Sequence, residues 1–369
     1  MANTNSTPPD TRYRPLNKFR LADLEAIRLV LRGGSVIDWH RLNFTEEEEA
    51  LEFLRSQELE PTDDVDRARM ESVKDEAIAF LRRNFDFPIP KPVANLELPG
   101  LLMLASGKGH RQVCACTILK VMHIIHHLQG RELAFTLPIS DQEIFYLVEE
   151  KVYRVIGGML ANGFPILEFI GGRKNKDSLY TKLMSKPETI AANIYDKLRF
   201  RIVTRSTDDI FPVVNYMLRH IFPFNYVIPS QSTNTLFHFR SYCAEHPRLR
   251  ELFEGLQLAP DLEDGMEDYD LPRLEHRFSA SDNQVVHFVV DMPVRLPAEV
   301  ASRAPSSAAN LGAIVFVQTE FQIIDRSSEQ QNELGEASHA AYKERQKIAV
   351  MHRLKVGIDN SKSIPPSKD

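Results

Sequence analysis

The stretch GGRKNKDSLYTKLMSKPETIAANIYDKLRFRIVT, residues 171–204, decides the fold of the second half of the chain. Ser178 and Lys182 are four residues apart, so they share one face of a helix that we expect over residues 177–184. Residues 198–204 alternate between apolar and basic side chains, which predicts a strand with one buried face. The second half of the chain is therefore expected to be an α+β domain.

Basic side chains and one carboxylate flank this helix. Arg173, Lys174 and Lys176 lie at its beginning, and Asp196 stands just before the strand. Lysine and arginine neutralise phosphate oxygens, while a carboxylate holds a hard divalent ion. One interpretation is a site for a metal-bound polyphosphate. The other is a solvated basic helix followed by an ordinary edge strand, because charge runs are usually exposed faces.

The first 160 residues are predicted to be mostly helical. Helices are expected over residues 21–32, 45–57, 65–84, 112–129 and 140–160. Thr45 with Glu48 has the spacing of a capping box, and so has Ser140 with Glu143. Gly130 is expected to end the fourth of these helices.

The second half mixes helices and strands. Strands are expected over residues 164–170, 198–204, 284–296 and 313–325, the third of them interrupted at Pro293. Helices are expected over 177–184, 208–220, 243–256 and 328–354. The last two strands are joined by a loop rich in proline, alanine and serine, and we expect them to pair antiparallel.

The strand over 313–325 has one polar face. Gln318, Glu320 and Gln322 alternate with apolar residues, which is typical of a strand that lines a cleft. Glu320 is therefore a candidate to join Asp196 as a magnesium ligand, or to act as the base on an attacking hydroxyl group. Two carboxylates on different strands and a basic cluster favour a metal-dependent phosphoryl-type transferase.

The order and spacing of these residues resemble the RelA/SpoT family of (p)ppGpp synthetases. The opening motif of that family is Arg-x-Lys-x3-Ser-x3-Lys, and Lys174, Ser178 and Lys182 fall in its register. The metal-binding aspartate of the family is followed five residues later by an arginine in a strand, as Asp196 is followed by Arg201.

Two further motifs of the family occur near the end of the chain. Its catalytic strand reads Glu-x-Gln-Ile, which matches residues 320–323. Its Glu-x-Gly-x-Ala-x-His-x2-Tyr-Lys helix matches residues 333–343 without a gap. Four motifs in the right order over residues 165–345 make the chain similar to a diverged member of this family.

The resemblance implies a fold and a chemistry. The fold is α+β, with a mixed, largely antiparallel sheet flanked by helices at residues 161–355, behind an N-terminal helical region at 17–160. The chemistry is transfer of the terminal pyrophosphate of ATP to the 3′-hydroxyl of GDP or GTP, with Mg²⁺ as cofactor. Such a transfer mainly needs alignment and neutralised oxygens.

The resemblance also assigns roles to residues. Those expected in catalysis are Asp196, Glu320 and Gln322, of which Asp196 and Glu320 would hold Mg²⁺. Those expected to bind substrates are Arg173, Lys174, Ser178, Lys182, Arg201, Gln284, His287 and His339.

The sequence departs from the family pattern mainly on the acceptor side. Arg173 stands one residue closer to Lys174 than in the family motif. Two segments, 234–237 and 284–287, compete for the place of the acceptor loop, and the second is preferred because it enters the strand that would pair with that of Glu320. The tyrosine that stacks on guanine is replaced by Thr233 or Asn283, and losing such a ring costs about 1–3 kcal/mol.

Composition limits the other function classes. The chain has 369 residues, a net charge of −6 and three cysteines, which argues against general polyanion or DNA binding and against a disulfide framework. No window predicts a membrane span or a signal peptide, so a cytoplasmic protein is expected. Residues 1–16 and 356–369 are polar and are expected to be disordered tails.

Alternatives remain at the level of function. The pyrophosphate could go to another acceptor, such as an adenine nucleotide or a tRNA 3′ end, or the chain could be a catalytically weak nucleotide-sensing module. His123 and His127 could bind zinc at their i,i+4 spacing, but packed or surface histidines are favoured because no third ligand is evident. The sequence leaves the oligomeric state open.

Overall fold

The computed structural model describes residues 13–32, 42–185, 197–228, 231–256, 284–334 and 339–361. Its strands form one five-stranded sheet in the order β1-β2-β5-β4-β3. They are β1 (Ile166–Arg173), β2 (Leu198–Thr204), β3 (Thr233–Asn234), β4 (Val286–Arg295) and β5 (Ile314–Asp325). β2 and β5 run parallel, and the other neighbouring strands are antiparallel. The predicted α+β class with a mixed, largely antiparallel sheet is confirmed.

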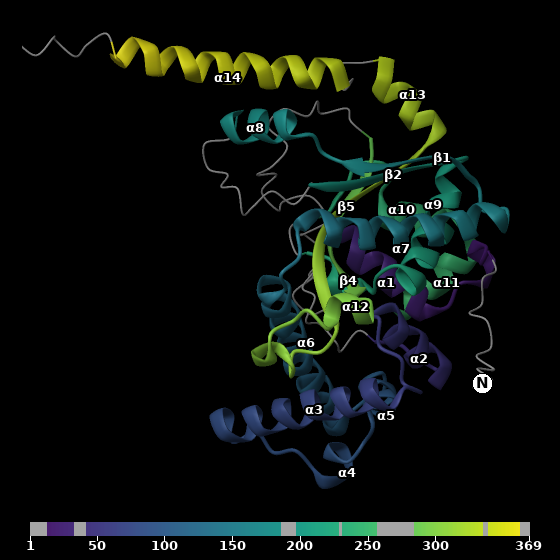
Figure 1. Ribbon diagram of the computed structural model, residues 1–369. Helices are drawn as coiled ribbons and strands as arrows, with labels where there is room; N and C mark the ends of the chain where they lie inside the picture. Colours follow the sequence, from purple (N-terminus) through teal and green to yellow (C-terminus); the bar gives the residue numbers. More distant parts are fainter. Residues whose placement is uncertain are drawn as a thin grey trace, which may run out of the picture.

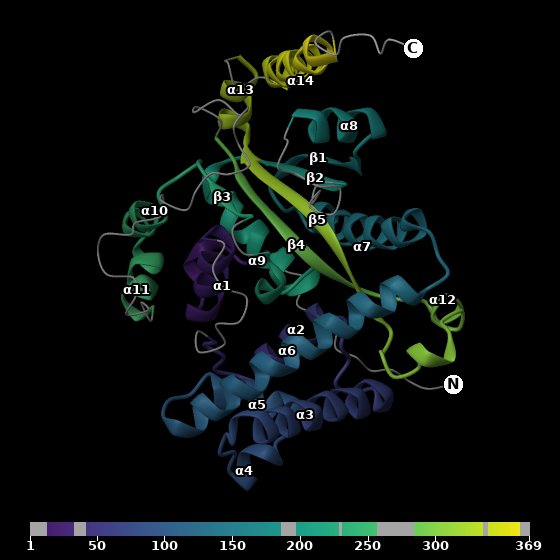
Figure 2. The ribbon, with the colours of Figure 1, turned by 90° about the vertical axis from the view of Figure 1, so that its left-hand side faces the viewer.

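Helices pack on both faces of the sheet (Figures 1 and 2). The N-terminal ones are α1 (Leu21–Arg32), α2 (Glu47–Ser56), α3 (Asp64–Phe85), α4 (Lys91–Ala94), α5 (Leu98–Ala105), α6 (His110–Thr136) and α7 (Asp141–Ala161). The later ones are α8 (Lys176–Ser185), α9 (Ile210–His220), α10 (Phe239–Glu245), α11 (Pro247–Gly255), α12 (Ala298–Ala301), α13 (Arg326–Leu334) and α14 (His339–Ser361). Short 3₁₀ turns are η1 (Leu16–Lys18), η4 (Thr207–Asp209), η5 (Phe224–Tyr226) and η6 (Ser306–Ala308). Figure 1 shows α3, α4 and α5 at one end of the molecule and α8, α13 and α14 at the other.

Aromatic side chains build one face of the sheet, which we call the aromatic face. Phe200 of β2, Phe288 of β4 and Phe321 of β5 are fully buried. The ring of Phe321 lies 5.6 Å from that of Phe200 and 5.7 Å from that of Phe288, measured between centroids. α7 covers this face, where its Tyr153 contacts Phe200 edge-on at 6.1 Å. Because side chains alternate along a strand, the residues between these phenylalanines face the other way.

β4 and β5 form the long antiparallel pair that the sequence predicts, visible in Figure 2 as two ribbons that run through the molecule. Pro293 does not interrupt β4. It lies beyond the two-residue register of β3, where β4 has lost its second neighbour, so a missing N–H group is tolerated there. The carbonyl oxygen of Pro293 accepts a hydrogen bond from Lys151 Nζ of α7 at 3.0 Å.

Gly130 does not end a helix, contrary to the prediction. α6 runs through it to Thr136, and the residue lies directly against the Phe316 ring and the Ile314 carbonyl oxygen of β5. A Cβ atom at this position would collide with both groups. The glycine is therefore needed for close approach of a helix to a strand, and not for a helix stop.

Two other local predictions need correction. The capping box of α2 joins Glu46 and Glu49 instead of Thr45 and Glu48, because Glu49 reaches back to the Glu46 N–H group. The closing helix is two helices, α13 and α14, rather than one. By contrast, the predicted capping box of Ser140 and Glu143 at the start of α7 is confirmed.

One hydrophobic core joins the N-terminal helices to the sheet. It includes Leu24 of α1, Val152 of α7 and Phe288 of β4. The predicted domain boundary at residue 160 falls between α7 and β1, and it remains a prediction. Of the expected tails, residues 1–12 and 362–369 lie outside the described part of the chain, whereas 356–361 belong to α14.

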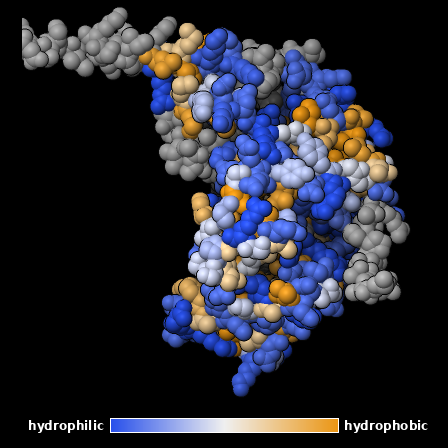
Figure 3. All heavy atoms as spheres, viewed as in Figure 1, coloured by the Kyte–Doolittle hydropathy of each residue, from blue (hydrophilic) through white to orange (hydrophobic). Residues whose placement is uncertain are grey.

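The surface seen in Figure 3 is mainly hydrophilic, with separate apolar groups. None of the helices in the described ranges is long and apolar enough to cross a membrane. α14 packs on α8, and Arg353 of α14 donates a hydrogen bond to the Met184 carbonyl oxygen at 2.7 Å.

Candidate active site

Polar side chains gather on the sheet face opposite the aromatic face. Strand register places them together, since Arg199 pairs with Glu320, Gln322 lies between Arg201 and His287, and Asp291 pairs with Gln318. We call this set the polar face; its members are Arg199, Arg201, His287, Asp291, Gln318, Glu320 and Gln322.

Glu320 lies in the middle strand of the polar face, and its neighbours hold its carboxylate in place. The residue is only 5% exposed. Gln322 Nε2 donates a hydrogen bond to Glu320 Oε1 at 2.7 Å, and His287 Nε2 lies 3.2 Å from the same oxygen. A buried carboxylate needs such partners, because an ionised group without them is costly to bury. The structure thus brings together three of the predicted site residues.

The two arginines of β2 differ in their surroundings. Arg199 is exposed and is the register partner of Glu320 on the neighbouring parallel strand. Arg201 is half-buried, and its Nη2 atom lies 3.2 Å from Glu329 Oε1 of α13. Arg201, which the resemblance assigned to substrate binding, is therefore in an ion pair with the protein itself, while Arg199 was not among the predicted site residues.

α13 closes one end of the polar face. Its Asn332 accepts a hydrogen bond from the Gln284 N–H group at 3.0 Å and donates one to the Gln284 carbonyl oxygen at 2.9 Å. The backbone of Gln284 is thereby fixed at the entrance to β4. His287 follows on the same strand, opposite Gln322.

The two segments that compete for the acceptor loop are neighbours in space. Thr233 of β3 pairs with His287, and Asn234 pairs with Val286. The Thr235 N–H group donates to the Val285 carbonyl oxygen at 3.0 Å, which continues the pairing. The preferred segment, 284–287, does enter the strand that pairs with that of Glu320, as expected. Asn283 lies outside the described residues.

α8 carries the predicted donor-binding residues. Asn175 Oδ1 accepts a hydrogen bond from the Ser178 N–H group at 2.8 Å, which fixes the first turn of the helix. Ser178 and Lys174 are half-buried, and Lys182 is 8% exposed. A lysine so buried must have polar or charged company, whereas Lys176 on the same helix is exposed.

Arg173 does not join the polar face. It pairs with Leu198 in the β1–β2 register, one residue out of step with Gly172, which pairs with Arg199. Its guanidinium group instead makes two hydrogen bonds to Glu149 of α7, at 3.0 and 2.8 Å. The structure therefore places Arg173 on the side of α7, and its predicted contact with ATP gains no geometric support.

Two predicted residues cannot be placed by their side chains. Asp196 lies outside the described residues, and His339 is the first residue of α14 with a side chain that is likewise not described. Their predicted roles remain predictions.

Sequence reasoning missed a second buried carboxylate on the polar face. Asp291 is 7% exposed, with Oδ2 lying 3.0 Å from His127 Nε2 and 3.8 Å from Arg131 Nη1 of α6. Asp291 is four residues after His287 on β4, so the two-residue alternation of a strand predicts that both side chains lie on the same face. Its partners come from a helix some 160 residues earlier, which no local pattern reveals.

The donor set of the polar face suits a hard cation. Carboxylate oxygens are the ligands that Mg²⁺ prefers, and Mg²⁺ is usually held by one or two of them together with substrate phosphates. Glu320 provides one, and Asp196 is the predicted second. Within the described ranges, no three His, Cys, Asp or Glu side chains are grouped closely enough to hold a metal by themselves. A site of this kind would bind the metal together with its nucleotide.

Comparison with known proteins gives matches among solved structures alone. No family model and no curated protein matches the sequence. The chain is similar to the small alarmone synthetase 1 from Bacillus subtilis bound to its product pppGpp, at 17% identity, with 59% of this chain and 87% of that chain covered and a TM-score of 0.29. It is also similar to the small alarmone synthetase 2 from Bacillus subtilis, at 15% identity, 60% and 97% coverage and a TM-score of 0.29.

A further similar structure is a GTP pyrophosphokinase family protein from Streptococcus pneumoniae, at 14% identity, 59% and 87% coverage and a TM-score of 0.29. These structures fall in the family that the sequence motifs resemble.

Proposed function

We propose that this chain transfers the terminal pyrophosphate of ATP to a hydroxyl acceptor with the help of Mg²⁺, most simply to the 3′-hydroxyl of GDP or GTP. The observation that carries the proposal is the buried carboxylate of Glu320, held by Gln322 and His287 on a polar face beside Arg199. A carboxylate and a guanidinium group on adjacent strands match the two needs of the reaction. These are a proton acceptor and a cation for phosphate oxygens.

In the proposed reaction, the acceptor oxygen attacks the β-phosphorus of ATP. A new oxygen–phosphorus bond forms, the bond from the β-phosphorus to the bridging oxygen of AMP breaks, and AMP leaves. The acceptor proton passes to Glu320 Oε2 or Oε1. Mg²⁺ would be held by Glu320 and Asp196, and when bound it would neutralise charge on the phosphate oxygens.

The protein residues around Glu320 position the base. Gln322 and His287 approach the same carboxylate oxygen from within β5 and from β4, so they restrict rotation of the carboxylate. Lys182 and Lys174 on and before α8 would neutralise the donor phosphates, with Asp196 as second ligand of the metal. Exact placement of the reactants supplies much of the rate in such transfers.

The acceptor is tested by a panel. Purified protein is incubated with γ-labelled ATP and Mg²⁺ in the presence of GDP, GTP, ADP, ATP or tRNA, and AMP and the labelled acceptor are measured. We expect AMP and a labelled guanine nucleotide. Label on ADP, ATP or tRNA would keep the chemistry but change the acceptor. Release of no AMP with any acceptor would overturn the proposal in favour of nucleotide sensing.

A further inference from the structure

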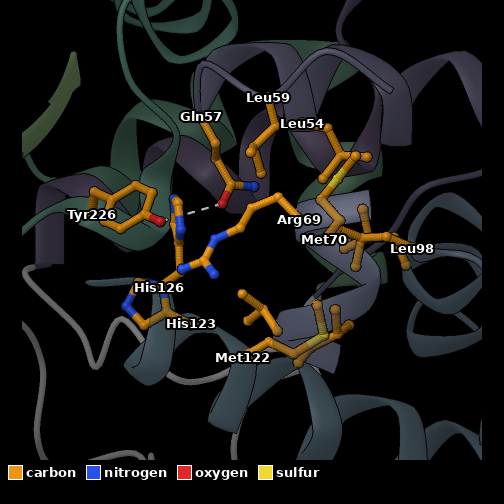
Figure 4. A pocket seen from close by; sticks show the side chains of 13 residues that line it. Leu54, Gln57, Leu59, Arg69, Met70, Leu98, Met122, His123, His126 and Tyr226 are labelled. Atoms are coloured by element: carbon orange, nitrogen blue, oxygen red, sulfur yellow. Dashed lines mark hydrogen bonds between the residues drawn. The ribbon is translucent and has the colours of Figure 1, made fainter. Parts of the chain in front are cut away.

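A small apolar cavity lies among the N-terminal helices α2, α3, α5 and α6 (Figure 4). Its volume is about 40 Å³, and leucine, valine and methionine side chains such as Leu102 and Met122 supply most of its lining. Arg69 borders the cavity, but its Nε atom is buried and the surface open to the space is almost wholly apolar. Charged groups are costly to place in such surroundings. A charged substrate is therefore expected at the polar face and not in this cavity.

On the polar face, Arg201 is held by a carboxylate of the protein itself. Its Nη2 atom lies 3.2 Å from Glu329 Oε1, and the side chains of Arg201 and Glu329 are only 27% and 12% exposed. A partly buried ion pair is screened less by salt than an exposed one, so the two charges neutralise each other effectively. Arg199, two residues earlier on β2, is exposed and has no ion pair within the part of the chain that the structure describes.

α13 holds Glu329 in a fixed place because the helix is anchored on both sides of this residue. At its start, the buried carboxylate of Asp325 accepts hydrogen bonds from the Ser328 N–H group at 3.0 Å and from Ser328 Oγ at 2.9 Å. Near its end, Asn332 makes its two hydrogen bonds to the backbone of Gln284. Glu329 lies between Ser328 and Asn332, so its carboxylate is in position before any substrate arrives.

A second arginine strengthens the hold on Glu329. Arg326 Nη1 lies 2.7 Å from Glu329 Oε2, so each oxygen of this carboxylate faces a different guanidinium group. Guanidinium groups bind carboxylates and phosphates through the same charge-assisted hydrogen bonds. Glu329 therefore competes with a substrate phosphate for Arg201.

We propose that Glu329 is a specificity-determining residue of the phosphate site, which it makes selective against ligands with more phosphate groups. The inference rests on the proposed function, since it concerns the same polar face. Glu329 neutralises Arg201, and its own negative charge opposes the charge of an incoming polyphosphate. Because this repulsion grows with the charge of the ligand, three linked phosphates are penalised more than two, and two more than one.

The test measures binding of inorganic phosphate, pyrophosphate and tripolyphosphate to the full chain by isothermal titration calorimetry, at constant ionic strength and without Mg²⁺. Glu329→Gln removes the charge and keeps the shape of the side chain. It should bind tripolyphosphate at least about five-fold more tightly than the unaltered protein, because one unit charge at short range changes an interaction by such a factor. The gain should be smaller for pyrophosphate and smallest for phosphate.

A matched control separates the position of the charge from the net charge of the chain. Glu150→Gln, at an exposed position of α7 on the side of the aromatic face, changes the net charge equally and should leave the three affinities unchanged. Equal or weaker binding of tripolyphosphate in Glu329→Gln, an equal gain in Glu150→Gln, or no binding in any of the proteins would overturn the inference.

Double variants test whether the gain passes through Arg201. Arg201→Met combined with Glu329→Gln should bind tripolyphosphate about as tightly as the unaltered protein, because the ion pair is removed as a unit. Arg326→Met combined with Glu329→Gln should keep the gain, and its loss there would overturn the assignment to Arg201. Thermal unfolding checks each variant. If Glu329→Gln does not fold, the first double variant still decides, since binding ten-fold weaker than that of the unaltered protein would show that Arg201 serves the ligand despite Glu329.

The result can be separated from the outcome of the transfer assay. Release of AMP by the unaltered protein, together with unchanged tripolyphosphate affinity in Glu329→Gln, would overturn this inference and leave the proposed function in place. A gain that depends on Arg201, without release of AMP for any acceptor, would support the inference and overturn the proposed function.

Discussion

The two faces of the central sheet divide structure from chemistry. The aromatic face packs Phe200, Phe288 and Phe321 against each other under α7, without titratable groups between the rings. The polar face, one residue out of phase on the same strands, carries Glu320 and Asp291, each buried beside a histidine. The difference shows that β5 performs both tasks through alternation alone, so adjacent residues should respond to mutation in opposite ways.

The largest expected effect is on the polar face. Glu320→Gln should lower the transfer rate by at least about 10²–10⁴-fold, since it removes a proton acceptor and a metal ligand while the amide still fits between Gln322 and His287. The fold should stay intact, as measured by circular dichroism and thermal unfolding. Glu168→Gln, which alters a half-buried carboxylate of β1 that lies 3.7 Å from Arg326 Nη1, is the matched control and should leave the rate unchanged. Unchanged turnover in Glu320→Gln would remove Glu320 from the mechanism.

Phe321 and Gln322 test the two faces at adjacent positions. Phe321→Ala should reduce the free energy of unfolding by about 3–5 kcal/mol, because the ring is fully buried against three other phenylalanines. Gln322→Ala should cost no more than about 1 kcal/mol of stability and should instead lower the transfer rate. Urea unfolding and initial rates of both variants give the comparison, and equal loss of stability in the two would contradict the division between faces.

Acid should lower the free energy of unfolding through His126 of α6, which lies at the end of the polar face that α6 covers. His126 contacts Phe316 edge-on at 5.5 Å, and burial lowers its pKa from 6.5 to about 4, with Arg69, His127 and Arg295 as the neighbouring groups that also lower it. Because the folded-state pKa is depressed, the neutral ring favours the folded state fully above pH 6.5. That contribution is lost as the pH falls towards about 4.

The expected size of this loss is up to about 3 kcal/mol. It is measured as the free energy of urea unfolding between pH 7 and 4, with His126→Gln as the variant in which the slope should decrease. His110→Gln, at the start of the same helix, serves as a control. A pH dependence that is identical in His126→Gln and the unaltered protein would rule out this source.

The smallest expected effect concerns Arg173. If Arg173 joins β1 to α7, Arg173→Ala and Glu149→Ala should each lower the free energy of unfolding by about 0.2–1 kcal/mol. The double variant should lose no more stability than either single variant, because both remove the same ion pair. Unfolding free energies of the double-mutant cycle give the coupling. A cycle without coupling, together with a raised KM for ATP in Arg173→Ala alone, would return Arg173 to the donor site.

Local patterns predicted much of the sheet. The alternation of 198–204 gave β2 with the correct ends, and the apolar runs around 284–296 and 313–325 gave the antiparallel pair of β4 and β5. These signals depend only on which side chains are buried along one strand, so a single sequence contains them.

The site was harder to predict because its partners are distant in sequence. The sequence places Arg173 in a basic cluster, but a one-residue step along β1 turns its side chain to α7, where Glu149 lies. Asp291 was missed because its partners His127 and Arg131 lie on α6. The local sequence predicts a helix stop at Gly130, because the contact with Phe316, nearly two hundred residues later, leaves no local pattern.

That contact at Gly130 has a consequence for how far this protein can vary. The gap between α6 and β5 admits a hydrogen atom and no methyl group, so any larger residue must move α6 away from β5 and displace the Phe316 ring. A shift of α6 would pull His127 from Asp291 and move the His126 ring relative to Phe316 in the same movement. The absence of a Cβ atom at Gly130 therefore sets the distance between α6 and β5. A substitution at this position would change the contacts of both histidines at once.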